Sequence, residues 1–239
     1  MSGTEWNGEG IGFKIPFSIP GVSTSILVSV DGDASHLLVE CGDGTSLFLH
    51  SIFGRHSERY ENVSCVMVTH EHLDHAGGIP ALLMLMEVAG RKSPMNIYTP
   101  CRAGGFIRGS LQHLKRRLHF EVNVLSTDGA NAFREAGIDV TPFRTEHRDS
   151  FPSDRCGKKV PSNGYSLTYR GNRYVFSGDT GPCRALEEAC SRASLAVIES
   201  TWEKPVDCDS LHLTVDQASA YGSLAREHIL IHPLRDNHS

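Results

Sequence analysis

The feature that most constrains this chain is the run Thr69–His75, T-H-E-H-L-D-H, in which five of seven residues can bind a metal ion. It directly follows residues 63–68, V-S-C-V-M-V, an apolar segment rich in β-branched residues that predicts a buried strand. Glycines and a proline at 76–80 then break the chain before an apolar helix predicted over 79–88. We therefore expect a strand-to-helix turn. A polar surface turn is the alternative, but nothing structural requires this composition directly after a core strand.

Within this turn, His70, His72 and Asp74 alternate along what we expect to be extended backbone, so their side chains point to one side. His75 follows where the chain begins to turn. The four side chains can therefore converge on a small volume. Neutral imidazole and carboxylate ligands favour zinc or a similar divalent ion.

Length and composition allow one large globular domain or two small ones, with 39% hydrophobic and 21% charged residues, and we expect a single domain over residues 1–239. No apolar run is long enough to cross a bilayer and the first residues lack the pattern of a signal peptide, so we expect a cytoplasmic protein with no membrane partner. The formal net charge of -5 argues against a surface coated for nucleic acid. Seven cysteines without a C-x-x-C pair predict reduced thiols.

Hydrophobic periodicity predicts strands first and then alternating strands and helices, in two similar halves. The predicted strands cover residues 12–18, 24–30, 36–40, 63–68, 95–99, 121–125, 138–144, 164–170, 173–176, 194–199 and 228–232. The predicted helices cover 79–88, 104–118 and 215–227, and another opens after 182. Residues 46–53 are left open between strand and helix, and 145–161 are predicted as loop. This order indicates sheets packed face to face with helices outside.

Four further polar residues fall just after predicted strands, where sites built on sheets usually lie. They are His147, Asp179, His212 and His232. Two neighbouring metal ions need about six to eight ligands. The turn and these strand ends supply seven, namely His70, His72, Asp74, His75, His147, Asp179 and His232, so the arithmetic fits a dinuclear site.

The run at 69–75, together with His147, S-G-D-T at Asp179 and His232, resembles the metallo-β-lactamase fold superfamily over nearly the whole chain. The closest resemblance is to the ribonuclease Z group and its phosphodiesterase relatives. It is carried by V-E-C-G-D-G-T at 39–45, by I-E-S-T at 198–201 and by L-H-L-T-V-D-Q-A at 211–218. The resemblance implies an α+β fold, the four-layer αββα sandwich of two similar halves.

The resemblance also implies a role for each residue of the site. One zinc ion would be held by His70, His72 and His147, the other by Asp74, His75 and His232, and Asp179 would bridge the two. Two Zn²⁺ per chain are therefore expected, with Mn²⁺ or Fe²⁺ as alternatives. Cations that share a water lower its pKa enough to give a bridging hydroxide near neutral pH, which would attack phosphorus.

Three catalytic residues follow from the same resemblance. Asp74 would ligate metal and orient the nucleophile, and His212, steered by Glu199, would protonate the leaving oxygen. A second interpretation of His212 is that it only happens to lie next to a helix cap at Thr214. A second interpretation of Glu199 is that it is a carboxylate on an edge strand. His147 and Asp179, taken alone, are compatible with a surface histidine and a turn aspartate.

Three departures from the family pattern bear on function. Glu40 stands where the group usually has aspartate, and its extra methylene is offset in our interpretation by Asp43 in place of the usual glutamate. Only 32 positions separate His147 from Asp179, which leaves no room for the long arm that grips tRNA in bacterial ribonuclease Z. His232-Pro233-Leu234-Arg235 replaces the usual H-F-S-x-R-Y ending.

These residues predict a dinuclear zinc-dependent phosphodiesterase that resembles ribonuclease Z, acting as an RNA endonuclease, with tRNA 3′ processing in doubt without the arm. The alternatives are a small-molecule or cyclic-nucleotide phosphodiesterase, another hydrolase of this fold, and a non-catalytic metal-binding protein. The substrate is a phosphodiester in RNA or in a small molecule. A homodimer is left open because a partner copy could supply docking surface.

Several residues keep two interpretations. The helix over 104–118 carries four cations that either contact a polynucleotide or form a solvated face, and these are Arg108, Lys115, Arg116 and Arg117. Trp202 either lines the pocket or belongs to the core. The histidines without motif context are interpreted as structural, and these are His36, His50, His56, His113, His119, His228 and His238.

Overall fold

The computed structural model describes seven stretches of the chain, residues 3–55, 57–100, 105–114, 116–129, 131–148, 157–205 and 212–234. They form two compact units, unit 1 over Met1–Thr127 and unit 2 over Asp128–Ser239. The expectation of a single domain over 1–239 stays a prediction. Predicted features that lie outside the described residues include Gly104, Lys115, residues 149–156, Arg235 and two of the histidines.

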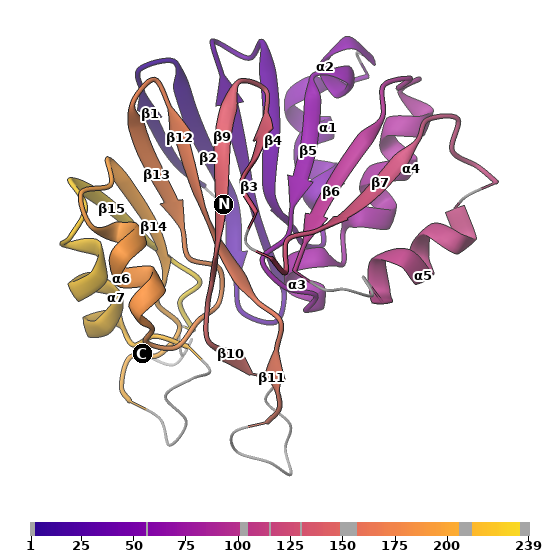
Figure 1. Cartoon of the computed structure of the whole chain (residues 1–239). Helices are drawn as coiled ribbons and strands as arrows, with labels where there is room; N and C mark the ends of the chain where they lie inside the picture. Colours follow the sequence, from indigo (N-terminus) through magenta and orange to yellow (C-terminus); the bar gives the residue numbers. More distant parts are fainter. Residues whose placement is uncertain are drawn as a thin grey trace. The chain divides into compact units, whose positions relative to one another are not determined.

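Unit 1 is built on a seven-stranded sheet in which the strands follow one another in sequence order (Figure 1). The strands are β1 Thr4–Gly8, β2 Ile11–Ile19, β3 Ser23–Val30, β4 Ser35–Cys41, β5 Val63–Met67, β6 Met95–Thr99 and β7 Val122–Ser126. Neighbours from β1 to β4 pair antiparallel, while β4 to β7 pair parallel. Parallel pairing requires crossover connections, and these contain the helices of the unit.

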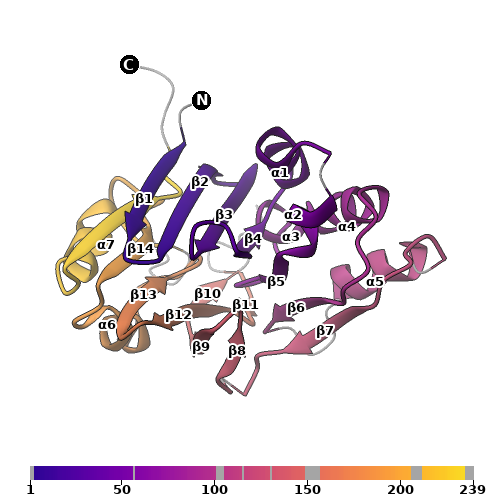
Figure 2. The same cartoon turned by 90° about the horizontal axis from the view of Figure 1, so that it is seen from above.

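The helices of unit 1 cover one face of this sheet (Figure 2). They are α1 Thr45–Phe53, α2 Ser57–Glu61, α3 Leu73–Ala76, α4 Ile79–Val88 and α5 Gly105–Leu114. The segment left open at 46–53 is therefore helix. The shared core consists of strand residues packed against helix residues, among them Leu27, Leu38, Val66, Leu49, Phe53, Leu82, Leu83, Met86 and Ile107. This packing fixes the position of β5, which is almost entirely buried.

Unit 2 contains a six-stranded sheet in the order β15-β14-β13-β12-β9-β8 and a separate two-stranded ribbon. The strands are β8 Phe133–Glu135, β9 Ile138–Arg144, β10 His147–Arg148, β11 Lys159–Val160, β12 Asn163–Tyr169, β13 Asn172–Phe176, β14 Leu195–Glu199 and β15 Glu227–Ile231. The first strands pair antiparallel, and β13, β14 and β15 pair parallel. Unit 2 thus repeats the scheme of unit 1, as predicted.

Two helices pack on the parallel part of this sheet, α6 Arg184–Cys190 and α7 Val215–Gly222 (Figure 1). Thr214 caps α7, since its hydroxyl accepts from Gln217 N while the Gln217 side chain accepts from Thr214 N. The predicted end of this helix at 227 is wrong. The chain turns after Gly222, because residues 223–226 are needed to bring β15 back beside β14.

The α+β class predicted from the sequence is confirmed, and the differences concern short or polar elements. The pattern did not predict β1, α2 or β8, and β10 and β11 lie within a predicted loop. The strand β1 is mostly exposed at the sheet edge, so it lacks an apolar alternation. The basic helix predicted over 104–118 ends at Leu114 within the described part of the chain.

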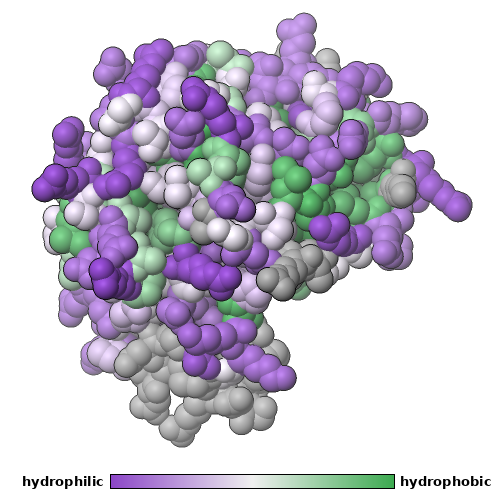
Figure 3. Space-filling model, in the orientation of Figure 1, coloured by the Kyte–Doolittle hydropathy of each residue, from purple (hydrophilic) through white to green (hydrophobic). Residues whose placement is uncertain are grey.

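The surface in the view of Figure 3 is mostly hydrophilic, with a hydrophobic patch over β6 and β7. Among the described residues, no helix is both long and apolar enough to cross a membrane. The described cysteines Cys41, Cys65, Cys183 and Cys190 are free thiols, as predicted.

Candidate metal centre

In unit 1, the four predicted ligands of the 69–75 run lie close together after β5. The ring centroid of His70 is 4.5 Å from that of His72 and 4.2 Å from that of His75. His70 and His75 are buried, and Asp74 is 9% exposed. The Nε2 atom of His75 lies 3.6 Å from Asp74 Oδ2. The predicted convergence of these side chains is therefore found within unit 1.

The predicted extended backbone through Asp74 is wrong. His72 is the last extended residue, with φ -65° and ψ 147°, and its carbonyl accepts hydrogen bonds from His75 N and Ala76 N. Asp74 and His75 therefore belong to the short helix α3. Because of this turn, the side chains of the consecutive residues Asp74 and His75 lie close together. In a strand, consecutive side chains would point to opposite faces.

Glu40 orients this cluster from the end of β4. Its carboxylate accepts from Thr69 Oγ1 and from Thr69 N, the latter at 3.2 Å, and its Oε1 lies 3.2 Å from His75 Nδ1. A carboxylate on one imidazole nitrogen sets the ring so that the other nitrogen can bind metal. Although Glu40 has an oxygen within 4.8 Å of nitrogen atoms of His70 and His75, these contacts favour an orienting role.

The backbone of Glu40 is left-handed, with φ +66°. It occupies a bulge, because Ser25 pairs with Cys41 and Ile26 with Val39, which leaves Glu40 outside the register. A non-glycine residue rarely adopts this conformation. The offset by Asp43 stays a prediction, and Asp43 Oδ1 accepts from Gly44 N.

Cys41 lies next to Glu40 but is not a candidate ligand. Burial raises the pKa of the Cys41 thiol to about 12. Among the described residues, Cys41 belongs to none of the groups of histidine, cysteine and acidic side chains whose donor atoms lie within 4.8 Å of one another. The donors of unit 1 are therefore imidazole and carboxylate groups.

In unit 2, the parallel strands β13, β14 and β15 end beside one another and present the other predicted residues. Asp179 follows β13, Glu199 is the last residue of β14, and His232 follows β15. His232 Nε2 lies 3.5 Å from Asp179 Oδ2. His147, on β10, has a nitrogen within 4.8 Å of ligand atoms of Asp179 and His212. The carboxyl ends of parallel strands thus assemble this group.

The carboxylate of Glu199 is fully buried and joins three segments of unit 2. Its Oε1 accepts from Thr180 N at 3.1 Å and Leu213 N at 3.0 Å. Its Oε2 accepts from Thr201 N at 2.9 Å and Thr201 Oγ1 at 2.8 Å. A buried carboxylate needs such donors to offset its desolvation. The interpretation of Glu199 as an edge-strand carboxylate is therefore wrong.

His212 completes this network. Its Nδ1 lies 3.1 Å from Glu199 Oε1 and 3.8 Å from Asp179 Oδ2. Because an ionised carboxylate only accepts, Nδ1 carries the proton in this contact. Nε2 is then the atom able to exchange a proton with a substrate. The ring of Trp202 meets His212 edge-on at 5.9 Å, and its buried Nε1 has no acceptor among the described residues.

These donor sets fit a divalent metal ion by their chemistry. They combine the imidazoles of buried histidines with the nearby carboxylates of Asp74 and Asp179. Such nitrogen and oxygen ligands suit Zn²⁺ and similar ions. One set of donors belongs to unit 1 and the other to unit 2, and each is described within its own unit.

Thr69, Thr201 and Gly21 were not identified from the sequence. Thr69 and Thr201 donate to Glu40 and Glu199, and Gly21 N donates to Asp74 Oδ2 at 2.8 Å. The two threonines could have been found in the sequence, because each is a residue with a hydroxyl group one or two positions from a predicted site residue. Glu71, within the run, is half-buried, and its Oε1 has no partner among the described residues.

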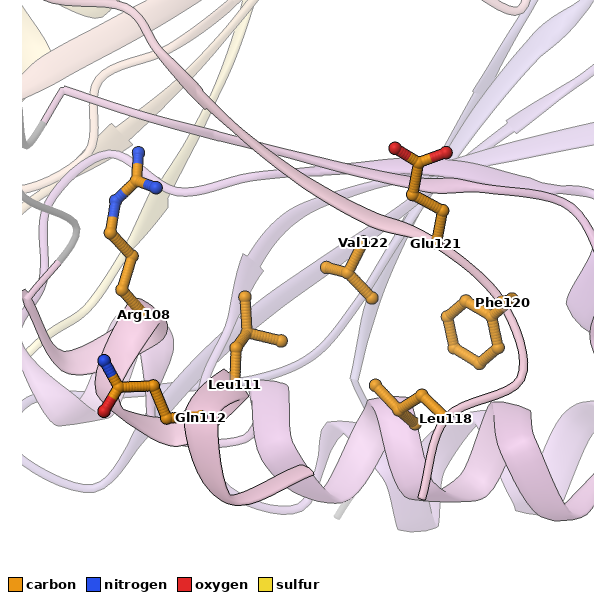
Figure 4. Close-up of a pocket in the computed structure, with 7 residues that line it drawn as sticks. All are labelled: Arg108, Leu111, Gln112, Leu118, Phe120, Glu121 and Val122. Atoms are coloured by element: carbon orange, nitrogen blue, oxygen red, sulfur yellow. The ribbon is translucent and has the colours of Figure 1, made fainter. Parts of the chain in front are cut away.

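Unit 1 also has a cavity of about 480 Å³, and none of its lining residues is a predicted ligand (Figure 4). Arg108, Leu111 and Gln112 come from α5, and the other wall is formed by Leu118, Phe120, Glu121 and Val122. The guanidinium of Arg108 donates to Val124 O at 3.4 Å. Arg116 and Arg117 are exposed and follow the end of α5, so they are not part of the described helix, and both interpretations of these cations stay open.

An α+β fold whose strand ends present clustered histidine and aspartate side chains defines a metal-dependent hydrolase of the metallo-β-lactamase fold. The sequence pattern of one family, described as "Beta-lactamase superfamily domain", matches residues 37–232. The chain therefore belongs to the β-lactamase superfamily and is a hydrolase with a metal cofactor, as the resemblance implied.

Relatives and a solved structure agree with this assignment. The chain is 26% identical over 228 residues to ribonuclease Z of Metallosphaera sedula, covering 80% of this chain and 74% of that one. It is 28% identical over 232 residues to human zinc phosphodiesterase ELAC protein 2, covering 89% of this chain but 27% of the relative. The crystal structure of the short form of human tRNase Z superposes with a TM-score of 0.69 at 21% identity and covers 92% of each chain.

Proposed function

We propose that this protein is a dinuclear zinc-dependent phosphodiesterase that cleaves RNA. The observation that carries the proposal is the pair formed by His212 and the buried Glu199. This pair lies beside the carboxylate of Asp179, which is a proposed metal ligand. A protein that only bound metal would have no use for a proton donor held in this way. Relatives named ribonuclease Z and zinc phosphodiesterase support the substrate class.

The proposal keeps the ligand sets that the family resemblance implies. His70, His72 and His147 would hold one zinc ion, Asp74, His75 and His232 the other, and Asp179 would bridge them. Support comes from the donor chemistry within each unit and from the name of the zinc phosphodiesterase relative. When bound, the cations would supply a water nucleophile near neutral pH and neutralise charge on the phosphate.

The chain's own residues would do the rest of the chemistry. The Asp74 carboxylate, held by Gly21 N, would orient the attacking water. His212 would donate the proton on Nε2 to the leaving oxygen while Glu199 holds Nδ1. Because Glu199 is fixed by backbone donors, the imidazole would need little reorganisation during the reaction.

A small-molecule or cyclic phosphodiesterase is the second candidate. It is favoured by the short segment from His147 to Asp179, 32 positions apart, in which the described part contains only β10 to β13, and by the net charge of -5. A homodimer that supplies docking surface belongs to the RNA proposal and is tested by light scattering.

The first experiment measures zinc content and turnover of an RNA with a 3′ extension, a 2′,3′-cyclic nucleotide and bis(p-nitrophenyl) phosphate. We expect two zinc ions per chain and cleavage of the RNA. A faster reaction with the cyclic nucleotide would favour the second candidate. A protein that retains two metals and hydrolyses a lactone or thioester, but no phosphodiester, would contradict the proposal.

The second experiment replaces the proton donor. His212→Ala should lower turnover of RNA about 10²–10⁴-fold and leave zinc content unchanged. The loss should be smaller with bis(p-nitrophenyl) phosphate, because p-nitrophenolate leaves readily without protonation. His228→Ala, which removes an exposed histidine of the same unit, is the matched control. Loss of metal from His212→Ala would show that His212 is a ligand instead.

A further inference from the structure

We infer that the turn between β2 and β3 is part of the metal site and that the backbone N–H of Gly21 positions Asp74. The inference rests on the proposed role of Asp74 as a metal ligand. Its basis is one contact within unit 1: Gly21 N donates to Asp74 Oδ2 at 2.8 Å, between residues 53 positions apart in the chain. Gly21 acts through Asp74 and is therefore a positioning residue.

The geometry of the turn makes this donor available. Val22 N donates to Ile19 O at 3.0 Å, which closes a four-residue turn with Pro20 and Gly21 at its centre. Proline at the second position and a glycine with φ +67° at the third are the signature of a type II turn. The closing bond uses Val22 N, so the Gly21 amide can donate outside the turn. Pro20 and Gly21 thus hold the donor in place before metal binds.

The contact restrains the Asp74 carboxylate. The oxygen that accepts from Gly21 N, Oδ2, also lies 3.6 Å from His75 Nε2, so both neighbours act on the same side of the group. The backbone around it is closely packed, since a Cβ on Gly42 would lie 2.3 Å from Asp74 O and 2.4 Å from Ser23 Oγ. The turn, Gly42 and α3 therefore have little room to shift independently. Partners of this kind orient metal ligands and strengthen metal binding.

The test replaces Gly21 by alanine. Alanine disfavours φ +67°, and relief of that strain by conversion to a type I turn rotates the central peptide, which takes the residue 21 N–H away from Asp74. Gly32→Ala is a matched control: Gly32 has φ +65°, lies in the turn between β3 and β4 and, like Gly21, has no atom within 4 Å of an added Cβ. The two variants should therefore lose similar thermal stability.

Metal affinity separates the two variants. Zinc binding is measured by competition with a chelator, and the coordination of the second ion is followed by the absorption spectrum of Co²⁺. We expect Gly21→Ala to weaken binding of one ion about 10–100-fold and Gly32→Ala to leave both affinities unchanged. Equal affinities in the two variants would overturn the inference.

An amide-to-ester replacement, with glycolic acid in place of Gly21, removes the N–H without adding a side chain, so it keeps the inference testable if Gly21→Ala unfolds. It should reproduce the loss of affinity, and an unchanged affinity would again overturn the inference. Because the readout is metal binding, a wild-type protein that binds two metals but cleaves no phosphodiester contradicts the proposed function alone. A wild-type protein that binds no metal contradicts both.

Discussion

In unit 1, the predicted ligands His70, His72, Asp74 and His75 come from one stretch of six residues after β5, whereas in unit 2 they come from separate strand ends. The first group is positioned mainly by local backbone geometry, with long-range contacts from the Glu40 carboxylate and from Gly21 N. The second group depends on tertiary contacts that converge on Glu199. A metal site can thus be built by local turns or by a buried hub, and the two should respond differently to damage.

The largest difference is expected when each orienting carboxylate is removed. Glu199→Ala leaves buried donors of three segments without an acceptor and should lower the free energy of unfolding by about 3–5 kcal/mol. Glu40→Ala affects Thr69 and His75 only and should lower it by about half as much. Urea unfolding with a chelator present removes the contribution of metal from both values. Equal losses would show that unit 1 depends on its carboxylate as strongly as unit 2.

A smaller effect is expected from shortening Glu40 to the aspartate usual in the family. From a left-handed backbone, Glu40 reaches both Thr69 and His75, and Glu40→Asp removes one methylene from that reach. We expect zinc affinity to fall about 10–100-fold, measured by chelator competition.

The double variant Glu40→Asp with Asp43→Glu tests whether residue 43 compensates. Recovery of zinc affinity would confirm the compensation predicted from the sequence. If the zinc affinity of the double variant stays low, the whole loss of affinity is due to the lost contacts of Glu40.

The smallest effect concerns His36, a buried residue of unit 1 that is not a predicted ligand. Burial lowers the pKa of His36 below its ordinary value of 6.5, and its ring packs 4.9 Å from that of Phe53. The unfolded chain therefore binds a proton at higher pH than the folded chain does. The stability that neutral His36 contributes is complete above pH 6.5 and is lost as the pH falls from 6.5 through the folded pKa.

This loss is limited to about 1.4 kcal/mol per pH unit, the value for one proton. It is measured as the difference in unfolding free energy between wild type and His36→Phe at several pH values, which cancels the protonation of the metal ligands. A flat difference for His36→Phe would contradict the assignment.

Sequence patterns predicted most of this architecture because buried strands and amphipathic helices have distinct periods. They identified β5 and the run after it, since a fold alone rarely requires five potential ligands directly after an apolar strand. They failed at β1, whose residues are mostly exposed, and at the end of α7, where a tertiary return to β15 decides the boundary.

Most of the predicted site residues lie near strand ends, where local pattern and chemistry coincide. The prediction that His212 directly follows a strand is wrong, since it lies 13 positions after the end of β14 and just before α7. The contacts of Gly21 and Thr201 could not be predicted, because one depends on a long-range backbone amide and the other on a network closed only in the folded unit. The helix geometry of Asp74 was also missed, because a single turn of α3 is too short to show a period.

The backbone at His232 limits how the metal preference of the site can change during evolution. With φ +62°, this position favours the few residue types that enter the left-handed region readily, namely histidine, asparagine, aspartate and glycine. Of these, aspartate is the only replacement that is an anionic ligand. A single His232→Asp exchange would therefore keep the local conformation while replacing a nitrogen donor by oxygen, which favours harder ions such as Mn²⁺ or Mg²⁺. In the proposed site, this left-handed residue thus provides a short mutational route from a nitrogen donor to an oxygen donor.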